Sequence, residues 1–412
     1  MILLSGADLV LPDRVLAGAT LVLEGDRIAE ILSSEAKDLP PQGGSHYTED
    51  TLSLDFPDHY IVPGFIDVHV HGIEGTDALD GGSAIATMAE RLPRYGVTAF
   101  CPTSIACDPA TLRQMLAGVR LARTTRPPGG ARVLPAHLES NFINPEYKGA
   151  QPLACLRGVT LRPEGTWSGA EVLDEIAAAR PDVGIVTLAP ELDGALELIA
   201  DLVSHGHHVS LGHSGATYEQ ALAGIRAGAR QATHLFNRMP ALGHRVPGLA
   251  GAVLESDEVV AELICDGVHV HPAMMRAALA AKRPERIMAI TDGTAGSGLP
   301  KGSRVTLGGY PITIRDAAYL DDGTIAGSSL TMDRAFAKLV SQVGLSLSDA
   351  ATVCATTPAR ALGLQGFGVV AAGAVADLAI LDLDLNVVQT WVAGTLAWER
   401  KQNFRTPEPP FS

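Results

Sequence analysis

Residues Pro63–Gly72 read PGFIDVHVHG, and this stretch indicates both the fold and the chemistry of the chain. From Val62 to Val70 the residues are almost all apolar, as in a strand that is buried on both faces of a parallel sheet. His69 and His71 are two positions apart, so an extended strand directs both imidazoles to the same side. Gly72 then ends the strand and leaves the histidines at its carboxyl end. Two imidazoles on one face predict a metal-binding pair, although a pair of hydrogen-bonded core histidines is the simpler alternative.

The middle of the chain alternates between apolar runs and helical stretches. Eight apolar runs have the composition of strands, at Ile61–Val70, Val97–Pro102, Val133–Leu138, Gly184–Leu188, His208–Leu211, Gln231–Leu235, Val260–Cys265 and Arg286–Ile290. Stretches with helical patterning follow most of them, at Ser83–Arg94, Pro109–Arg123, Gly169–Arg180, Asp193–Ser204, Thr217–Ala227 and Pro272–Lys282. Such repeated units predict an α/β fold, a parallel (β/α)8 barrel of the TIM type. A doubly wound open sheet is the alternative, but no GxGxxG motif follows the first strand.

Both ends of the chain are rich in β-type sequence. Short apolar runs occur at Leu9–Leu11, Ala19–Leu23, Arg27–Leu32, Gly368–Val370, Ala379–Leu383, Val387–Val392 and Thr395–Trp398. We therefore predict that residues 1–62 and 366–412 together form a small β-sandwich domain, and that residues 63–365 form the barrel.

The composition is typical of a globular protein with a large core. Of the 412 residues, 46% are hydrophobic and 19% are charged, and the formal net charge of -15 argues against nucleic acid and anionic membranes as partners. The five cysteines are scattered and form no CxxC motif, which predicts a reducing environment. We see no signal peptide and no run of about 18 apolar residues that could span a membrane, so we predict a cytoplasmic protein.

Polar residues follow the apolar runs at points that a barrel would bring to one mouth. These residues are His137, Glu139, His213, His234, Asn237, Asp266, His269 and Asp292. A buried polar group needs a partner, and catalytic residues of a (β/α)8 barrel lie at the carboxyl ends of its strands, so we interpret the set as one site. Each residue has a simpler explanation when taken alone: Glu139 could form a salt bridge, and Asp292 could cap a turn.

In their order along the chain, these segments resemble the amidohydrolase superfamily, and within it the N-acetylglucosamine-6-phosphate deacetylases. The resemblance is carried by PGFIDVHVHG, HLESNFINPEYKGAQ, GHSGAT, THLFNRM, HRVPG, ICDGVHVHP, ITDGTAGSGLP and GSSLTMD, between residues 61 and 333. The β-rich ends are similar to the small domain of that family.

The resemblance implies a metal site. Glu139, His213 and His234 resemble the ligands of the principal ion, and His69 and His71 resemble those of a second ion that Glu139 bridges to the first. One or two divalent ions per subunit are therefore implied. We expect zinc, with iron, manganese and cobalt as alternatives that also suit histidine and carboxylate ligands.

The resemblance also implies catalytic and substrate-contacting residues. Asp292 resembles the general base and acid of the reaction, and His269, Asn237 and Arg245 resemble residues that contact the substrate. In the family this arginine comes from a neighbouring subunit and holds the sugar phosphate, which implies a homodimer. The expected substrate is an amino-sugar phosphate, N-acetylglucosamine-6-phosphate, which would be converted to glucosamine-6-phosphate and acetate.

The chain departs from the family pattern around the predicted sugar site. Ser140 and Asn141 stand where the family has Gly-Pro, Gln151 stands where it has a histidine that reaches the substrate, Gly215 replaces an asparagine, and Arg238 replaces an alanine. Gln151 can donate a hydrogen bond but carries no charge. We expect Gln151 and Arg238 to contact the substrate, and we predict another N-acetylhexosamine, such as N-acetylgalactosamine-6-phosphate, as the alternative substrate.

Two other classes of function are open alternatives. The first is a different amidohydrolase, such as a cyclic amidase or an N-acyl amino acid deacylase. Those enzymes often bridge their metals with a carboxylated lysine, whereas here Glu139 holds the comparable place and no lysine lies in the third or fourth run. The second is a binding protein without activity, and the presence of Asp292 with all the metal ligands argues against it.

Overall fold

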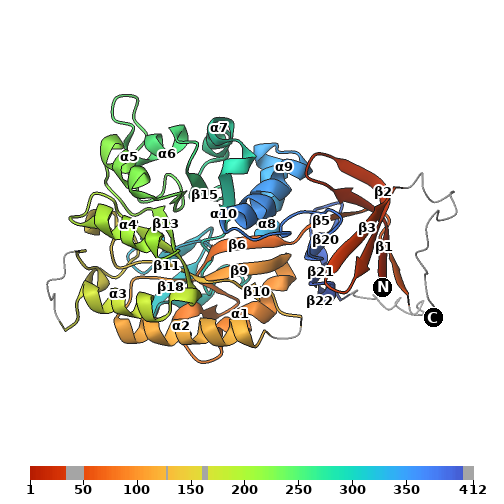
Figure 1. The fold of residues 1–412 in the computed structure, drawn as a ribbon, viewed down its shortest axis with the longest axis horizontal. Helices are drawn as coiled ribbons and strands as arrows, with labels where there is room; N and C mark the ends of the chain where they lie inside the picture. The colour runs from red at the N-terminus through yellow and green to blue at the C-terminus, as the bar shows by residue number, and fades with distance from the viewer. Residues whose placement is uncertain (34–50, 127–128, 160–165, 402–412) are drawn as a thin grey trace, which may run out of the picture.

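The computed structural model describes residues 1–33, 51–126, 129–159 and 166–401, which form a barrel and a sheet domain (Figure 1). The predicted α/β fold is confirmed. The barrel strands, in spatial order, are β6 (Phe65–Val70), β9 (Val97–Ser104), β11 (Ala136–Glu139), β12 (Val183–Leu188), β13 (His208–Leu211), β14 (Gln231–Ala232), β15 (Val260–Ile264) and β16 (Ile287–Ile290). All neighbouring pairs along this order are parallel. The barrel is nearly closed, because Asp292 donates its backbone N–H to the carbonyl of His69 over 2.9 Å, just beyond β16.

Three predicted strands differ in the structure. The run predicted over Ile61–Val70 is divided at Gly64 into β5 (His59–Pro63), which belongs to the sheet built from the two ends of the chain, and β6. The run predicted over Val133–Leu138 is split into β10 (Arg132–Val133) and β11, because the Pro135 between them has no N–H to donate to a ladder. The run predicted over Gln231–Leu235 ends at Ala232. His234 has a φ of 33° and Phe236 a φ of 77°, and a left-handed backbone cannot continue a strand.

Helices cover the outside of the barrel (Figure 1). They are α1 (Ala84–Arg91), α2 (Pro109–Thr124), α3 (Gly169–Ala178), α4 (Ala195–Ser204), α5 (Tyr218–Ala227), α6 (Gly248–Glu255), α7 (Pro272–Lys282), α8 (Met332–Lys338), α9 (Leu347–Ala351) and α10 (Thr357–Ala361). Asp108 caps α2 by accepting the backbone N–H groups of Ala110 and Thr111 over 3.0 and 3.1 Å. Helix α6 was not predicted, because its sequence GLAGAVLE has almost no polar face.

Strands from both ends of the chain form the second sheet, at the right of Figure 1, so the predicted separate domain built from both termini is confirmed. Its members are β1 (Ile2–Val10), β2 (Val15–Glu24), β3 (Arg27–Leu32), β4 (Leu52–Asp55), β5 (His59–Pro63), β20 (Leu378–Asp382), β21 (Val387–Val392) and β22 (Thr395–Glu399). Hydrogen bonds join them in the order β22-β21-β20-β5-β1-β2-β3, with β4 beside β1. The run 368–370 is not a strand. The exact domain limits stay a prediction, and residues 34–50 and 402–412 lie outside the described part of the chain.

Short antiparallel strands also lie within the barrel sequence. They are β7 (Gly72–Ile73) with β8 (Thr76–Asp77), and β17 (Arg304–Leu307), β18 (Tyr310–Ile314) and β19 (Ala318–Leu320) after the last barrel strand. The second group packs Ile312 and Ile314 against Ile105 and Leu307. This insertion forms part of the wall around the mouth of the barrel, where Leu307 lines the cavity described below.

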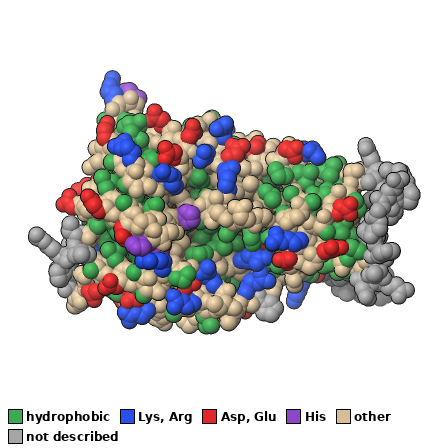
Figure 2. Space-filling view, in the orientation of Figure 1, with side chains coloured by type: hydrophobic (Ala, Val, Ile, Leu, Met, Phe, Trp, Pro, Cys, Tyr) green, Lys and Arg blue, Asp and Glu red, His purple; other side chains and the backbone are tan. Residues whose placement is uncertain are grey.

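The buried and exposed surfaces follow from this arrangement. Every residue of β6 is buried, as predicted for this strand, and every residue of β9 is buried too, which is typical of strands covered on both faces. On the face in Figure 2, basic and acidic side chains are interspersed over the barrel, so attraction of an anion depends on cations close to the site. In the described ranges, no helix is both long and apolar enough to cross a bilayer.

Candidate metal centre and active site

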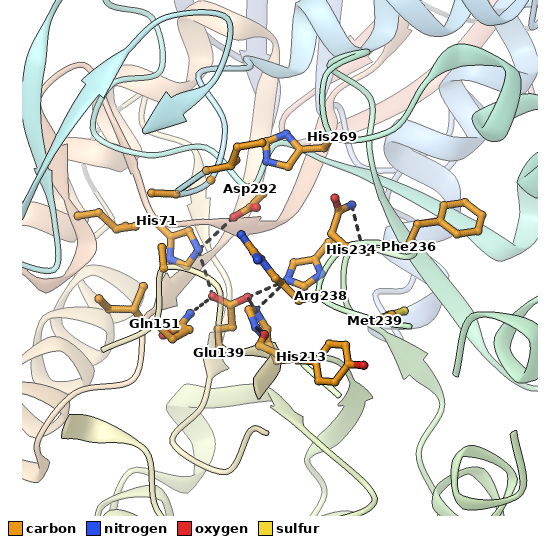
Figure 3. A pocket seen from close by; sticks show the side chains of 18 of the residues that line it. His71, Glu139, Gln151, His213, His234, Phe236, Arg238, Met239, His269 and Asp292 are labelled. Atoms are coloured by element: carbon orange, nitrogen blue, oxygen red, sulfur yellow. Dashed lines mark hydrogen bonds and ion pairs between the residues drawn. The ribbon is translucent and has the colours of Figure 1, made fainter. Parts of the chain in front are cut away.

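Five predicted metal ligands lie together at the carboxyl end of the barrel. Figure 3 shows His71, Glu139, His213 and His234 among them. His69 is in β6, Glu139 ends β11, and His71, His213 and His234 follow β6, β13 and β14. All five side chains are buried. The nearly closed ring of strands therefore brings together residues that are far apart in the sequence.

The first group consists of Glu139, His213 and His234. Glu139 Oε1 lies 2.7 Å from His213 Nε2 and 2.9 Å from His234 Nε2, and the two nitrogens are 3.1 Å apart. The two rings meet edge to face at 74°. Three atoms that can each donate an electron pair to a cation thus converge on one point.

The second group shares Glu139 with the first. His69 Nε2 and His71 Nε2 are 3.3 Å apart, and Glu139 Oε2 lies 3.6 Å from the nitrogen of His71. Asp292 completes the cluster, because its Oδ1 lies 3.2 Å from His71 Nε2 and 3.5 Å from His69 Nε2. The two oxygens of Glu139 therefore face the two groups, and Asp292 faces the same space.

Left-handed backbone at three positions directs these side chains into the mouth. His213 and Asp292 have a φ of 47°, and His234 has a φ of 33°. Such conformations cost on the order of 1–3 kcal/mol for residues other than glycine and tend to occur at functional sites. The three residues follow short strands, and their strained backbone conformation directs the side chains toward the mouth of the barrel.

The arrangement fits a divalent cation. The Nδ1 atoms of His69, His71 and His213 lie 2.9, 3.2 and 2.9 Å from Glu262 Oε2, the Thr103 carbonyl and the Tyr147 carbonyl. These acceptors face Nδ1, so Nε2 is the atom of each ring that faces the centre and can bind a cation. His234 Nδ1 is the exception, since it has no hydrogen-bond partner in the described part of the chain.

The electrostatics of the cluster also call for positive charge. Burial alone would raise the pKa of Glu139, but His213 and His234 hold it well below its ordinary value. Burial would likewise raise the pKa of Asp292, which the hydrogen bond with His71 lowers. Burial opposes the charged form of His71, yet its contacts with Asp292 and Glu139 raise its pKa to about 9. Two ionised carboxylates in a buried site thus need cationic partners, and a metal ion can take that place.

Above the cluster lies a cavity of about 450 Å³. Of the predicted substrate contacts, Gln151, Asn237, Arg238 and His269 line it. His269 Nδ1 lies 2.6 Å from Asp266 Oδ2, which leaves the other ring nitrogen free to face the cavity. The cavity is large enough for a substrate of the size of a sugar phosphate.

Gln151 makes contacts that the sequence did not predict. Its Nε2 donates to Glu139 Oε2, and its Oε1 accepts the backbone N–H of Ala106 over 2.7 Å. Both polar atoms of this buried side chain therefore have protein partners. A direct contact between Gln151 and the substrate stays a prediction.

The structure does not bring Arg245 to the cavity of its own chain. Among the described residues that line the cavity Arg245 is absent, and it is exposed in the loop that joins β14 to α6. This loop protrudes from the barrel beside α5 (Figure 1). A contact with a neighbouring subunit's substrate stays a prediction.

Sequence reasoning missed Glu262. This residue lies in β15 and is fully buried, and burial raises its pKa to about 7. The available signal was a single glutamate inside the apolar run VAELI, since a buried carboxylate requires a partner. The partner itself could not be read from the sequence.

Comparisons with known proteins agree with this geometry. The amidohydrolase family profile matches residues 60–397. The chain is 36% identical over 340 residues to N-acetylgalactosamine-6-phosphate deacetylase of Escherichia coli, covering 82% of this chain and 87% of that protein. It is 35% identical over 350 residues to N-acetylglucosamine-6-phosphate deacetylase of Bacillus subtilis, covering 84% and 86%.

Solved structures show the same similarity along nearly the whole chain. N-acetylglucosamine-6-phosphate deacetylase of Thermotoga maritima superposes with a TM-score of 0.82 at 30% identity, covering 97% of this chain and 100% of that one. An aspartate-to-alanine variant of the Mycobacterium smegmatis deacetylase, in complex with N-acetyl-D-glucosamine-6-phosphate, superposes with a TM-score of 0.84 at 33% identity, covering 96% and 99%. The chain therefore belongs to the amidohydrolase family and, within it, to the N-acetylglucosamine-6-phosphate deacetylase family.

Proposed function

We propose that this protein removes the acetyl group from an N-acetylated amino-sugar phosphate, with N-acetylglucosamine-6-phosphate as the first candidate. The observation that carries the proposal is the convergence of four imidazoles and two carboxylates at the base of one cavity. The relatives named above support the choice of substrate. The products would be glucosamine-6-phosphate and acetate.

Five residues would hold the metal in this proposal. Glu139, His213 and His234 form the principal site, and His69 and His71 form the second site with Glu139 as the bridge. A bound divalent ion supplies Lewis acidity, which polarises a carbonyl and lowers the pKa of a bound water toward about 7. We propose zinc, because a site of imidazoles and one carboxylate suits it, and iron, manganese and cobalt are the alternatives.

Asp292 is the proton carrier in this proposal. Its carboxylate is buried at the base of the cavity, and the hydrogen bond with His71 keeps its pKa low although burial opposes this. It accepts a proton from the attacking water and then delivers that proton to the departing amine. One water molecule thereby cleaves the amide: its oxygen enters acetate, and its two protons end on the amine nitrogen, which leaves as an ammonium group.

Four further residues would hold the sugar phosphate. His269 lines the cavity and offers an N–H donor, Asn237 lines it with its side-chain amide, and Arg238 adds a cation at the same wall. Arg245 would serve the cavity of a neighbouring subunit, which makes the working form a homodimer. The cytoplasmic location expected from the sequence belongs to the same proposal.

A second candidate substrate is N-acetylgalactosamine-6-phosphate. The specific observation in its favour is that the wall of the cavity departs from the family pattern at Gln151 and Arg238, while the metal ligands keep it. The Escherichia coli relative is named for that substrate. Because the cavity wall differs from the family pattern and the metal ligands do not, we expect a different substrate preference and the same deacetylation reaction.

Acetate release by metal-depleted and reconstituted protein tests the proposal. The chelated protein would receive zinc, iron, manganese or cobalt and then N-acetylglucosamine-6-phosphate, N-acetylgalactosamine-6-phosphate or unphosphorylated N-acetylglucosamine. Hydrolysis restored by metal, with one of the phosphorylated sugars preferred, is the expected result. Absence of metal-restored hydrolysis of every sugar would exclude the proposed function, and equal turnover without phosphate would exclude the phosphate contacts.

Two variants make a matched pair for that assay. Glu139→Gln should abolish both metal retention and turnover, because it removes the charge that all four imidazoles face. Glu146→Gln makes the same chemical change at an exposed residue of the cavity wall and should retain bound metal. Equal behaviour of the two variants would contradict the assignment of Glu139.

A further inference from the structure

Glu262 lies in the barrel interior and contacts both groups of metal ligands. It is fully buried in β15, and its Oε2 lies 2.9 Å from Nδ1 of His69. The same oxygen accepts the backbone N–H of His234 over 3.3 Å. The Glu262 backbone carbonyl also accepts the N–H of Leu235 over 2.8 Å. A single residue thus holds one ligand from each half of the site.

We infer that Glu262 is the positioning residue of the second metal site, where it fixes the tautomer and ring orientation of His69. This inference rests on the metal site of the proposed function. Glu262 does not face the cavity and touches neither substrate nor ion, so it acts only through the residues that it holds.

The chemistry of imidazole gives the physical reason. A ring with its hydrogen on Nδ1 carries its lone pair on Nε2, and a carboxylate facing Nδ1 stabilises that tautomer. His71 and His213 use backbone carbonyls for the same purpose, whereas His69 uses the side-chain carboxyl group of Glu262. A carboxylate makes the imidazole a stronger electron-pair donor than a carbonyl does. Loss of such a partner typically weakens metal binding by about 10- to 100-fold.

A purely structural role does not explain this side chain. Glu262 Oε1 is buried and has no hydrogen-bond partner in the described part of the chain. His137 Nδ1 is 3.7 Å from Oε1, but it bonds instead to the Val68 carbonyl over 2.9 Å. A half-satisfied buried carboxylate lowers the stability of a fold. Its presence beside His69 is therefore better explained by the ligand that it orients.

Metal stoichiometry and affinity distinguish the two roles. Glu262→Gln keeps an oxygen acceptor for His69, and Glu262→Leu removes it. Gln231→Leu is the matched control, because Gln231 is buried in the neighbouring strand β14 and its side chain has no hydrogen-bond partner in the described residues. Bound ions per subunit would be measured by elemental analysis, and the affinity of each ion by competition with a chelator of known affinity.

For wild type and Gln231→Leu we expect two ions. Glu262→Leu should retain one ion, and Glu262→Gln should retain two, the second bound about 10- to 100-fold more weakly. Two ions of wild-type affinity in Glu262→Leu would overturn the inference. If Glu262→Leu does not fold, unchanged affinity for the second ion in Glu262→Gln would overturn it equally.

Crystal structures of the metal-free proteins test the same inference without a bound ion. The ring of His69 should turn away from its wild-type orientation in Glu262→Leu and keep that orientation in Glu262→Gln. An unchanged ring in Glu262→Leu would overturn the positioning role. If wild type binds no divalent ion, the metal site of the proposed function fails, and these metal-free structures still decide the role of Glu262.

Discussion

Arg238 gives a sharp test of how the cavity recognises an anion. Its exposed guanidinium lies against Gly149, where an added Cβ would sit 2.6 Å from Arg238 Nε. It makes no side-chain hydrogen bond or ion pair with the other residues that the structure describes. The change Arg238→Met keeps most of the apolar stem and removes the charge, so we expect no loss of fold stability.

The size of the effect follows from the exposure of Arg238. Two unit charges about 4 Å apart in a water-like medium attract each other by about 1 kcal/mol. A phosphate group carries roughly 1.5 to 2 negative charges at pH 7, so Arg238 should contribute about 1.5–2 kcal/mol to binding. Arg238→Met should therefore lower kcat/KM about 10- to 30-fold for a phosphorylated substrate, mainly through KM.

The assay compares phosphorylated with unphosphorylated N-acetylglucosamine at low and high salt. The loss should appear only with the phosphorylated sugar and should shrink as salt screens the charges. Arg226→Met, on the exposed face of α5, is the matched control and should lose nothing. Equal losses for both sugars, or no loss for either, would refute the reasoning.

Three further predictions concern the proton carrier, the barrel interior and a buried lysine. Asp292→Asn should lower kcat by about 10²- to 10⁴-fold with little change in KM, because the asparagine side chain cannot take up the proton of the attacking water. A loss of kcat under tenfold in steady-state kinetics would contradict this prediction. Thr187→Val removes a buried hydroxyl that lies 2.7 Å from both the His137 imidazole and the Thr233 hydroxyl, so chemical denaturation should show a free energy of unfolding lower by about 1–3 kcal/mol. Burial lowers the pKa of Lys282 from 10.5 to about 8. Between these two pH values the unfolded chain therefore binds more protons than the folded chain. The free energy of unfolding should consequently contain a contribution from Lys282 that rises with pH over this range. Lys282→Met should lack that contribution, and parallel pH profiles of the two proteins would show that the lysine is not the cause.

The sequence by itself determined the fold class and predicted most of the residues that the structure brings together at the mouth of the barrel. Apolar runs and helical patterning are local properties, so the barrel could be predicted from them, as could the cap that Asp108 provides for α2. His69 and His71 share one face of a strand because side chains alternate along any strand. The family resemblance added the roles of residues such as Asp292.

Only the tertiary structure decided which of these residues contact one another. Glu139 meets His213 and His234 across separations of 74 and 95 residues, and Glu262 meets His69 across 193. Contacts of this kind depend on how the strands tilt and close into a ring, and no local pattern encodes that closure. The same holds for Gln151, because its bond to Glu139 arises from the path of a loop across the mouth of the barrel.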